Sequence, residues 1–218
     1  MHTIINELRN TSIRNIIFDL GGVILPINYQ LTIRKFEEFG FTNFKETFTQ
    51  AAQIDLFDKL DKGLVKPETF RTTIREIAGK NLSDAQIDEA WNAMLLDFIP
   101  ARLALLTKVK EYYNTFLLSN TNAIHYAVYL NQLKKQTGIA TLSGFFNKEY
   151  YSHLIHLRKP DRETFEFILH ENGLKPDETL FIDDTLQHVE GARKAGLKAY
   201  HLKVNQGESI EQLFAYLL

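Results

Sequence analysis

The sequence predicts an α/β protein with three layers, in which helices cover both faces of a parallel sheet and a helical domain is inserted into the chain. Short runs of β-branched and aromatic residues recur along the chain, and segments with helical spacing separate them. Residues 28–98 differ, because they show helical spacing without a convincing strand. With 218 residues and 44% hydrophobic residues, the chain is long enough for a sizeable core plus an insertion.

The expected strands are short and end at polar residues or glycine. The first spans Ile13–Phe18, and similar runs follow at Thr115–Leu118, Thr179–Ile182 and Lys198–Leu202, with Phe146–Tyr151 as a further candidate. Apolar spacing predicts helices at Arg102–Tyr112, Asp161–Glu171 and Leu186–Ala195. Strands that alternate with helices favour a parallel sheet covered on both faces.

The inserted block has the sequence features of a small helical core. Phe36 and Phe39 are three residues apart, and Phe44 and Phe48 are four apart, which is typical of residues on one helix face. Pro67 and the Ser83-Asp84 pair are typical helix starts. Pro26 and Pro100 bracket the block, so we expect a core formed by residues 1–27 and 99–218 and a helical domain at 28–98.

Composition narrows the class of protein. The formal net charge of -2 gives no basic surplus for nucleic acid or an anionic membrane. The chain has no cysteine, which excludes disulfides, thiolate metal sites and cysteine nucleophiles. No apolar run approaches the roughly 18 residues that span a membrane, and the first 15 residues lack the apolar stretch of a signal peptide. We therefore expect a cytoplasmic protein that binds neither nucleic acid nor membrane.

Polar residues follow the predicted strands, where open parallel sheets bind their ligands. They are Asp19 after the first strand, Ser119 and Asn120 after the second, Lys159 before a helix, and Asp183 with Asp184 after the fourth run. Each alone is explained by a turn, a helix cap or a helix dipole. Together, three acids, a hydroxyl, an amide and a lysine suit a divalent cation plus a phosphate.

The ordered set IIFDLGGV, FLLSNTN, RKP and LFIDD resembles the haloacid dehalogenase-like hydrolase superfamily, in its subgroup with a helical cap after the first motif. The resemblance implies a Rossmann-like core and an Asp19 nucleophile that forms an aspartyl-phosphate. It also implies that Ser119, Asn120 and Lys159 meet the phosphate. Magnesium would be held by Asp19, Asp183, Asp184 and the backbone carbonyl of Gly21. The expected partner is a small phosphorylated metabolite.

One position departs from that resemblance. Most phosphatases of the superfamily carry a second Asp two residues after the nucleophile, as general acid and base, and here that residue is Gly21. Because general acid catalysis supplies about 10²–10⁴-fold, a phosphatase survives without it, best on good leaving groups. The pattern is similar to a subgroup that acts on glucose 1-phosphate, whose anomeric oxygen leaves easily. A water or a cap side chain could replace the acid.

Two other functions stay open. A 2-haloacid dehalogenase needs no acid for its halide, although the doubled Asp183-Asp184 fits it poorly without a cation. A non-catalytic relative that binds a phosphorylated metabolite has no electrostatic need for three acids. His125 is a candidate substitute acid–base, and Thr121 and Asn122 are candidate substrate contacts. His153 and His156 share a metal-like spacing but lack a third ligand, so two loop histidines are the simpler interpretation.

Overall fold

A computed structural model describes residue 8 and residues 12–41 and 55–217. Its centre is a five-stranded parallel sheet in the order β3-β2-β1-β4-β5. The strands are β1 (Asn15–Phe18), β2 (Asn114–Ser119), β3 (Lys148–Tyr151), β4 (Thr179–Asp183) and β5 (Lys198–His201). The predicted α/β class and parallel sheet are therefore confirmed. Strands β1 and β4 are buried throughout because helices cover both faces, which is why they read as apolar runs.

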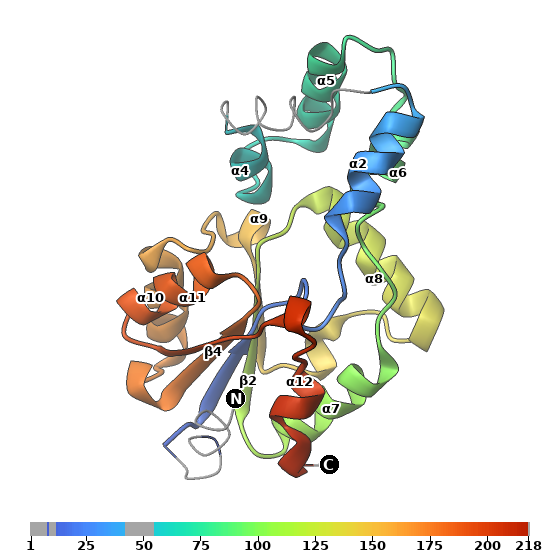
Figure 1. The fold of residues 1–218 in the computed structure, drawn as a ribbon. Helices are drawn as coiled ribbons and strands as arrows, with labels where there is room; N and C mark the ends of the chain where they lie inside the picture. The colour runs from blue at the N-terminus through green and yellow to red at the C-terminus, as the bar shows by residue number, and fades with distance from the viewer. Residues whose placement is uncertain (1–7, 9–11, 42–54, 218) are drawn as a thin grey trace.

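Alternate residues of each strand enter two different hydrophobic clusters. Ile16 and Phe18 of β1 pack in the cluster that contains helices α7 (Pro100–Lys110), α8 (Ala123–Thr137) and α12 (Ile210–Leu213). Ile17 packs on the other face, with α10 (Arg162–Asn172) and α11 (Leu186–Lys194). Figure 1 shows these two helical layers on either side of the sheet. The short helix α9 (Ser152–Ile155) follows β3, and 3-10 turns lie at Leu142–Gly144, Pro176–Glu178, Val204–Gln206 and Ala215–Leu217.

A separate group of helices, here called the helical unit, lies beyond the carboxyl ends of the strands (Figure 1). It comprises α2 (Tyr29–Glu38), α4 (Leu56–Asp61), α5 (Pro67–Ala78) and α6 (Asp84–Asn92). Its own hydrophobic cluster includes Phe36, Phe70 and Ile87. As expected from the sequence, Pro67 begins α5, and Ser83 forms a capping box with Gln86 at the start of α6. Phe44 and Phe48 lie outside the described residues.

Element boundaries differ from the sequence expectations by a few residues. Helix α7 begins at Pro100 rather than Arg102, because proline fits the first helical position. β1 pairs from Asn15 onward although Ile13 is buried, and β3 begins at Lys148 rather than Phe146.

Two connecting segments link the helical unit to the sheet, and they pair in an antiparallel bridge between Ile27 and Leu95. Within the part of the chain that the structure describes, no helix is long and apolar enough to span a membrane.

Candidate active site

Strand register brings the predicted site residues to one edge of the sheet. Phe18 pairs with Leu117 on one side and Ile182 on the other, so Asp19, the end of β2 and Asp183 lie at the same level. The Asp19 amide donates to the Ile182 carbonyl at 2.9 Å, which holds this edge together. A pocket opens there. Its walls include the predicted residues Asp19, Gly21, Ser119, Asn120, Thr121, Asn122, His125, Lys159 and Asp184.

The ammonium group of Lys159 lies between two carboxylates. It donates to Asp19 Oδ1 at 2.6 Å and to Asp183 Oδ2 at 2.7 Å, and its side chain is 1% exposed. Burial alone would lower the pKa of Lys159, but the two carboxylates raise it above its ordinary value, so the group stays charged. This is the only lysine among the described residues that is fully buried.

Asn120 holds the backbone of Lys159 with both ends of its amide. Its Oδ1 accepts from the Lys159 N–H at 3.0 Å, and its Nδ2 donates to the Lys159 carbonyl at 2.8 Å. A side-chain amide satisfied at both ends is a positioning group, because little of its hydrogen-bonding capacity is left for a ligand. The structure therefore places Asn120 at the predicted site, with its amide engaged by the lysine loop rather than free in the pocket.

Asp183 is also held by the protein on both oxygens. Oδ1 accepts from the Thr185 N–H at 2.7 Å, and His188 Nδ1 lies 3.0 Å from Oδ2, which Lys159 also contacts. Although burial opposes ionisation, Lys159 and His188 hold the pKa of Asp183 down at about 2. The ionised Asp183 thus anchors the lysine, while Asp19 and Asp184 keep oxygens facing the pocket.

The three acids form a cluster with more negative than positive charge. Asp19, Asp183 and Asp184 each offer an oxygen, and these oxygens lie within 4.8 Å of one another. Three carboxylates face one ammonium, and burial together with Asp183 raises the pKa of Asp19 to about 8 in spite of Lys159. A cluster that binds a proton this strongly lacks positive charge. Its hard oxygen donors fit a divalent cation.

Gly22 makes the close approach of Asp184 possible. Its φ is +77°, and an added Cβ would lie 2.2 Å from Asp184 Oδ2. No other residue type fits this position without moving Asp184. Gly21 lines the pocket beside it, and the predicted role of its carbonyl as a metal ligand stays a prediction.

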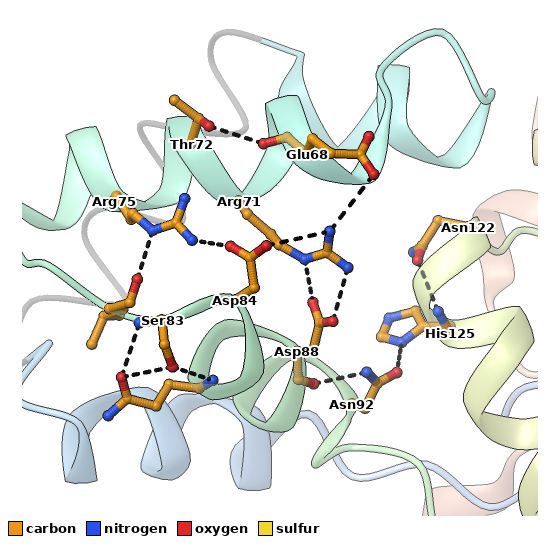
Figure 2. Close-up of polar contacts among 12 residues, drawn as sticks. Glu68, Arg71, Thr72, Arg75, Ser83, Asp84, Asp88, Asn92, Asn122 and His125 are labelled. Carbon is orange, nitrogen blue, oxygen red and sulfur yellow. Dashed lines mark hydrogen bonds and ion pairs between the residues drawn. The ribbon is translucent and has the colours of Figure 1, made fainter.

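His125 is buried and part of a polar chain that runs into the helical unit. Arg71 forms two hydrogen bonds to Asp88, the Asp88 carbonyl accepts from Asn92 Nδ2 at 2.7 Å, and Asn92 Oδ1 lies 2.9 Å from His125 Nδ1 (Figure 2). Because Asn92 Oδ1 only accepts, His125 Nδ1 carries the hydrogen.

The same histidine is neutral. Its ring stacks on Trp91 with a centroid distance of 5.1 Å and an interplanar angle of 9°. Burial lowers the pKa of His125 to about 3, so the imidazolium is absent near pH 7. The acid–base role considered for His125 from the sequence therefore does not fit its surroundings, although the residue does line the pocket.

The two histidines with metal-like spacing take part in packing. His153 lies in α9 and His156 ends it, where its Nδ1 is 2.7 Å from the Lys62 carbonyl of the helical unit. An added Cβ at Gly63 would be 2.3 Å from the His153 carbonyl, so the two segments are in close contact. The structure gives them no third metal-binding partner among the described residues. His153 lies within a short helix and His156 ends it, so they do not lie in the loop expected from the sequence.

Comparison with known proteins decides the family. A sequence model of the haloacid dehalogenase-like hydrolases matches residues 13–196. The chain belongs to this family. A structure of a haloacid dehalogenase family enzyme from Bacteroides thetaiotaomicron, in complex with magnesium and inorganic phosphate, is 37% identical. It has a TM-score of 0.80 and covers 93% of this chain and 99% of its own.

Two further relatives bear on function. A D-ribitol-5-phosphate phosphatase from Bacteroides thetaiotaomicron is 26% identical over 188 residues, which is 86% of this chain and 91% of that protein. An L-2-haloacid dehalogenase structure from Xanthobacter autotrophicus has a TM-score of 0.56 with 16% identity, over 86% of this chain and 76% of its own. The latter shows the shared fold of the haloacid dehalogenase-like hydrolases and nothing finer.

Sequence reasoning missed the residues that the helical unit contributes to the pocket. Tyr29, Asp61 and Trp91 line it together with the family motifs. Asp61 ends α4, and the same short helix carries a second acid, Asp58. The sequence pattern does not show which of these two acids lines the pocket. Trp91 has the spacing of a core aromatic, and it fills the core with one face while it meets His125 with the other.

Proposed function

We propose that this protein is a magnesium-dependent phosphatase that hydrolyses a small phosphate monoester through an aspartyl-phosphate on Asp19. The observation that carries the proposal is the buried Lys159 ammonium between Asp19 and Asp183, at the base of a pocket that also contains Asp184. The excess of negative charge in this site suits a divalent cation, and a bound cation attracts a phosphate group. Removal of a halide requires neither a cation nor a phosphate.

Each residue has a role that its contacts support. Asp19 attacks phosphorus, and Lys159 neutralises part of the charge between carboxylate and phosphate. Ser119 lies buried at the end of β2 and offers its hydroxyl to a phosphate oxygen. Asp19, Asp184 and the Gly21 carbonyl would hold the magnesium ion, and Asp183 would steady the site through Lys159. When bound, magnesium supplies positive charge that screens the phosphate from the nucleophile.

The substrate class we propose is a phosphorylated polyol or sugar. A relative that covers most of this chain acts on D-ribitol 5-phosphate. The pocket pairs polar groups, among them Asn122 and the neutral His125, with the aromatic ring of Trp91. Such a lining suits a hydroxylated carbon chain, because hydroxyls both donate and accept hydrogen bonds while the carbon chain packs against apolar side chains such as Ile27 and Met94.

The test is phosphate release from a panel of esters that includes D-ribitol 5-phosphate and both anomers of glucose 1-phosphate. We expect release with magnesium, none with a chelator, and none from Asp19→Asn, which should also fail to form a phosphoenzyme. Normal turnover by Asp19→Asn would overturn the mechanism. Release of chloride from 2-chloropropionate without release of phosphate would instead identify a dehalogenase, and neither product would identify a binding protein.

A further inference from the structure

The missing acid at Gly21 leaves a chemical requirement unmet. A primary-alcohol leaving group such as that of ribitol 5-phosphate needs a proton as its P–O bond breaks. An added Cβ at Gly21 would lie 3.3 Å from Ile27 Cδ1, so the space beside residue 21 adjoins an apolar side chain. The proton donor has to come from another wall of the pocket.

Most titratable groups of the pocket are unsuitable donors. Lys159 is bound to two carboxylates, and His188 lies against Asp183. His125 is neutral, and its Nδ1 hydrogen is directed to Asn92. The pKa of Tyr29 is raised to about 12 by partial desolvation in the pocket and by the nearby carboxylates, which makes it a weak acid. Apart from the metal cluster, Asp61 is the remaining acid that lines the described part of the pocket.

Asp61 faces the same space as the family carboxylates. It ends helix α4, which Figure 1 shows beyond the edge of the sheet next to α9. The pKa of the Tyr29 hydroxyl is raised both by the three acids of the metal cluster and by Asp61. The Tyr29 hydroxyl therefore lies within electrostatic reach of Asp61 and of that cluster. Asp61 and the nucleophile thus line one pocket, so both can face a substrate bound in it.

The hydrogen bonds around Asp61 leave one oxygen for a proton. Asn122 Oδ1 accepts from the His125 N–H at 3.1 Å, so its NH₂ is directed to Asp61 Oδ1 at 3.2 Å. Among the described residues, the ion-pair partner of Oδ2 is Arg158 at 4.0 Å, and Arg158 donates its closer hydrogen bond, 2.7 Å long, to Asp58. Burial raises the pKa of Asp61 above its ordinary value despite Arg158 and Asn122.

We propose that Asp61 of the helical unit is the general acid and base that replaces the one absent at Gly21. This inference rests on the proposed phosphatase function. In the first step an Asp19 oxygen forms a bond to phosphorus while the ester P–O bond breaks, and the Asp61 proton passes to the leaving oxygen. In the second step the Asp61 carboxylate takes a proton from the attacking water, whose oxygen bonds to phosphorus as the bond from Asp19 breaks.

The test compares Asp61→Asn with the wild type on two esters, in magnesium. On D-ribitol 5-phosphate we expect kcat/KM to fall by about 10²–10³-fold. On p-nitrophenyl phosphate, whose phenolate leaves without a proton, kcat/KM should change by less than about threefold. Because the second step loses its base, a burst of p-nitrophenolate close to one equivalent should precede slow turnover. Introducing Gly21→Asp into Asp61→Asn should recover part of the lost rate.

Two variants are matched controls. Asp58→Asn removes an acid from the same helix that contacts Arg158 outside the pocket, and both esters should stay within about threefold of the wild type. Tyr29→Phe tests the weaker acid, and we expect it to keep its rate on ribitol 5-phosphate within about tenfold. Asp61→Ser serves as a second variant should Asp61→Asn fail to fold, with the size of the p-nitrophenolate burst as the check of folding.

Several results would overturn the assignment. Equal losses on both esters, or no loss on either, would show that Asp61 does not protonate the leaving group. If Tyr29→Phe lowers kcat/KM on ribitol 5-phosphate alone, and Asp61→Asn does not, the general acid is the tyrosine. Failure of the proposed function is distinct, because then neither ester would show turnover that depends on Asp19.

Discussion

Removing the positive charge of Lys159 should destabilise the protein strongly. Lys159→Met keeps an unbranched apolar side chain and removes the ammonium, which lies 5.4 Å from the centre of the Phe181 ring. It leaves Asp19 and Asp183 buried without their counter-charge. Breaking a buried ion pair in this way costs about 3–5 kcal/mol. With a urea slope of about 3 kcal/mol per M, the unfolding midpoint should fall by about 1–2 M.

The loss should depend on pH with a defined sign. In the wild type Lys159 and His188 hold the pKa of Asp183 down at about 2, so its contribution is present above the unfolded pKa and is lost as pH falls toward 2. In Lys159→Met the folded pKa of Asp183 rises above the unfolded value, and the folded pKa of Asp19, already raised in the wild type, rises further. Protonation then relieves the repulsion, and the deficit should be smaller at pH 5 than at pH 8.

The assay is urea unfolding followed by circular dichroism, with a chelator present so that no cation replaces the lysine. Lys148→Met is the matched control, because its ammonium pairs with Glu171 at 2.8 Å but the side chain is 47% exposed. We expect that control to lose less than about 1 kcal/mol. An equal loss in both variants, or a Lys159→Met deficit that is the same at pH 5 and pH 8, would refute the electrostatic reasoning.

Three further outcomes are expected. Gly22 and Gly138 share a φ of +77°, so Gly22→Ala and Gly138→Ala should each lose about 1–2 kcal/mol of stability. Only Gly22→Ala places a Cβ against Asp184, so it alone should weaken magnesium binding, by about 10–100-fold in calorimetry. Because burial and the neighbouring carboxylates raise the pKa of Asp19, magnesium binding at pH 7 should release protons, measured in buffers of different ionisation enthalpy, and no release would contradict the raised pKa. Gly21→Asp in the wild type should change kcat/KM on ribitol 5-phosphate by less than about threefold, since the helical unit already supplies an acid; a tenfold gain would show that none is present.

The sheet and its active edge could be predicted from the sequence because their causes are local. β1 and β4 are buried on both faces, so they leave continuous apolar runs. Asp19 comes directly after β1 and Asp183 ends β4, and parallel strands bring their carboxyl ends to one edge. Short-range patterns were therefore sufficient for these elements.

The hydrogen bonds within the site could not be predicted in the same way. Asn120 follows a strand, and only the fold brings it to Lys159, 39 residues later. Asn92 meets His125 across 33 residues, and that contact determines which ring nitrogen carries the hydrogen. Such pairs depend on how the helical unit sits on the core, which no periodicity encodes.

On the proposed assignment, the position of the acid makes the chemistry depend on contact between the helical unit and the core. The nucleophile and Lys159 both belong to the core and stay together whatever the helical unit does. Asp61 instead reaches the pocket on α4, and the residues that follow it, Lys62 and Gly63, hold this segment against α9 of the core. A leaving group that needs a proton is therefore expelled only when these contacts are made and water is excluded. A leaving group that needs none escapes this control, which is why the two esters separate the acid from the nucleophile.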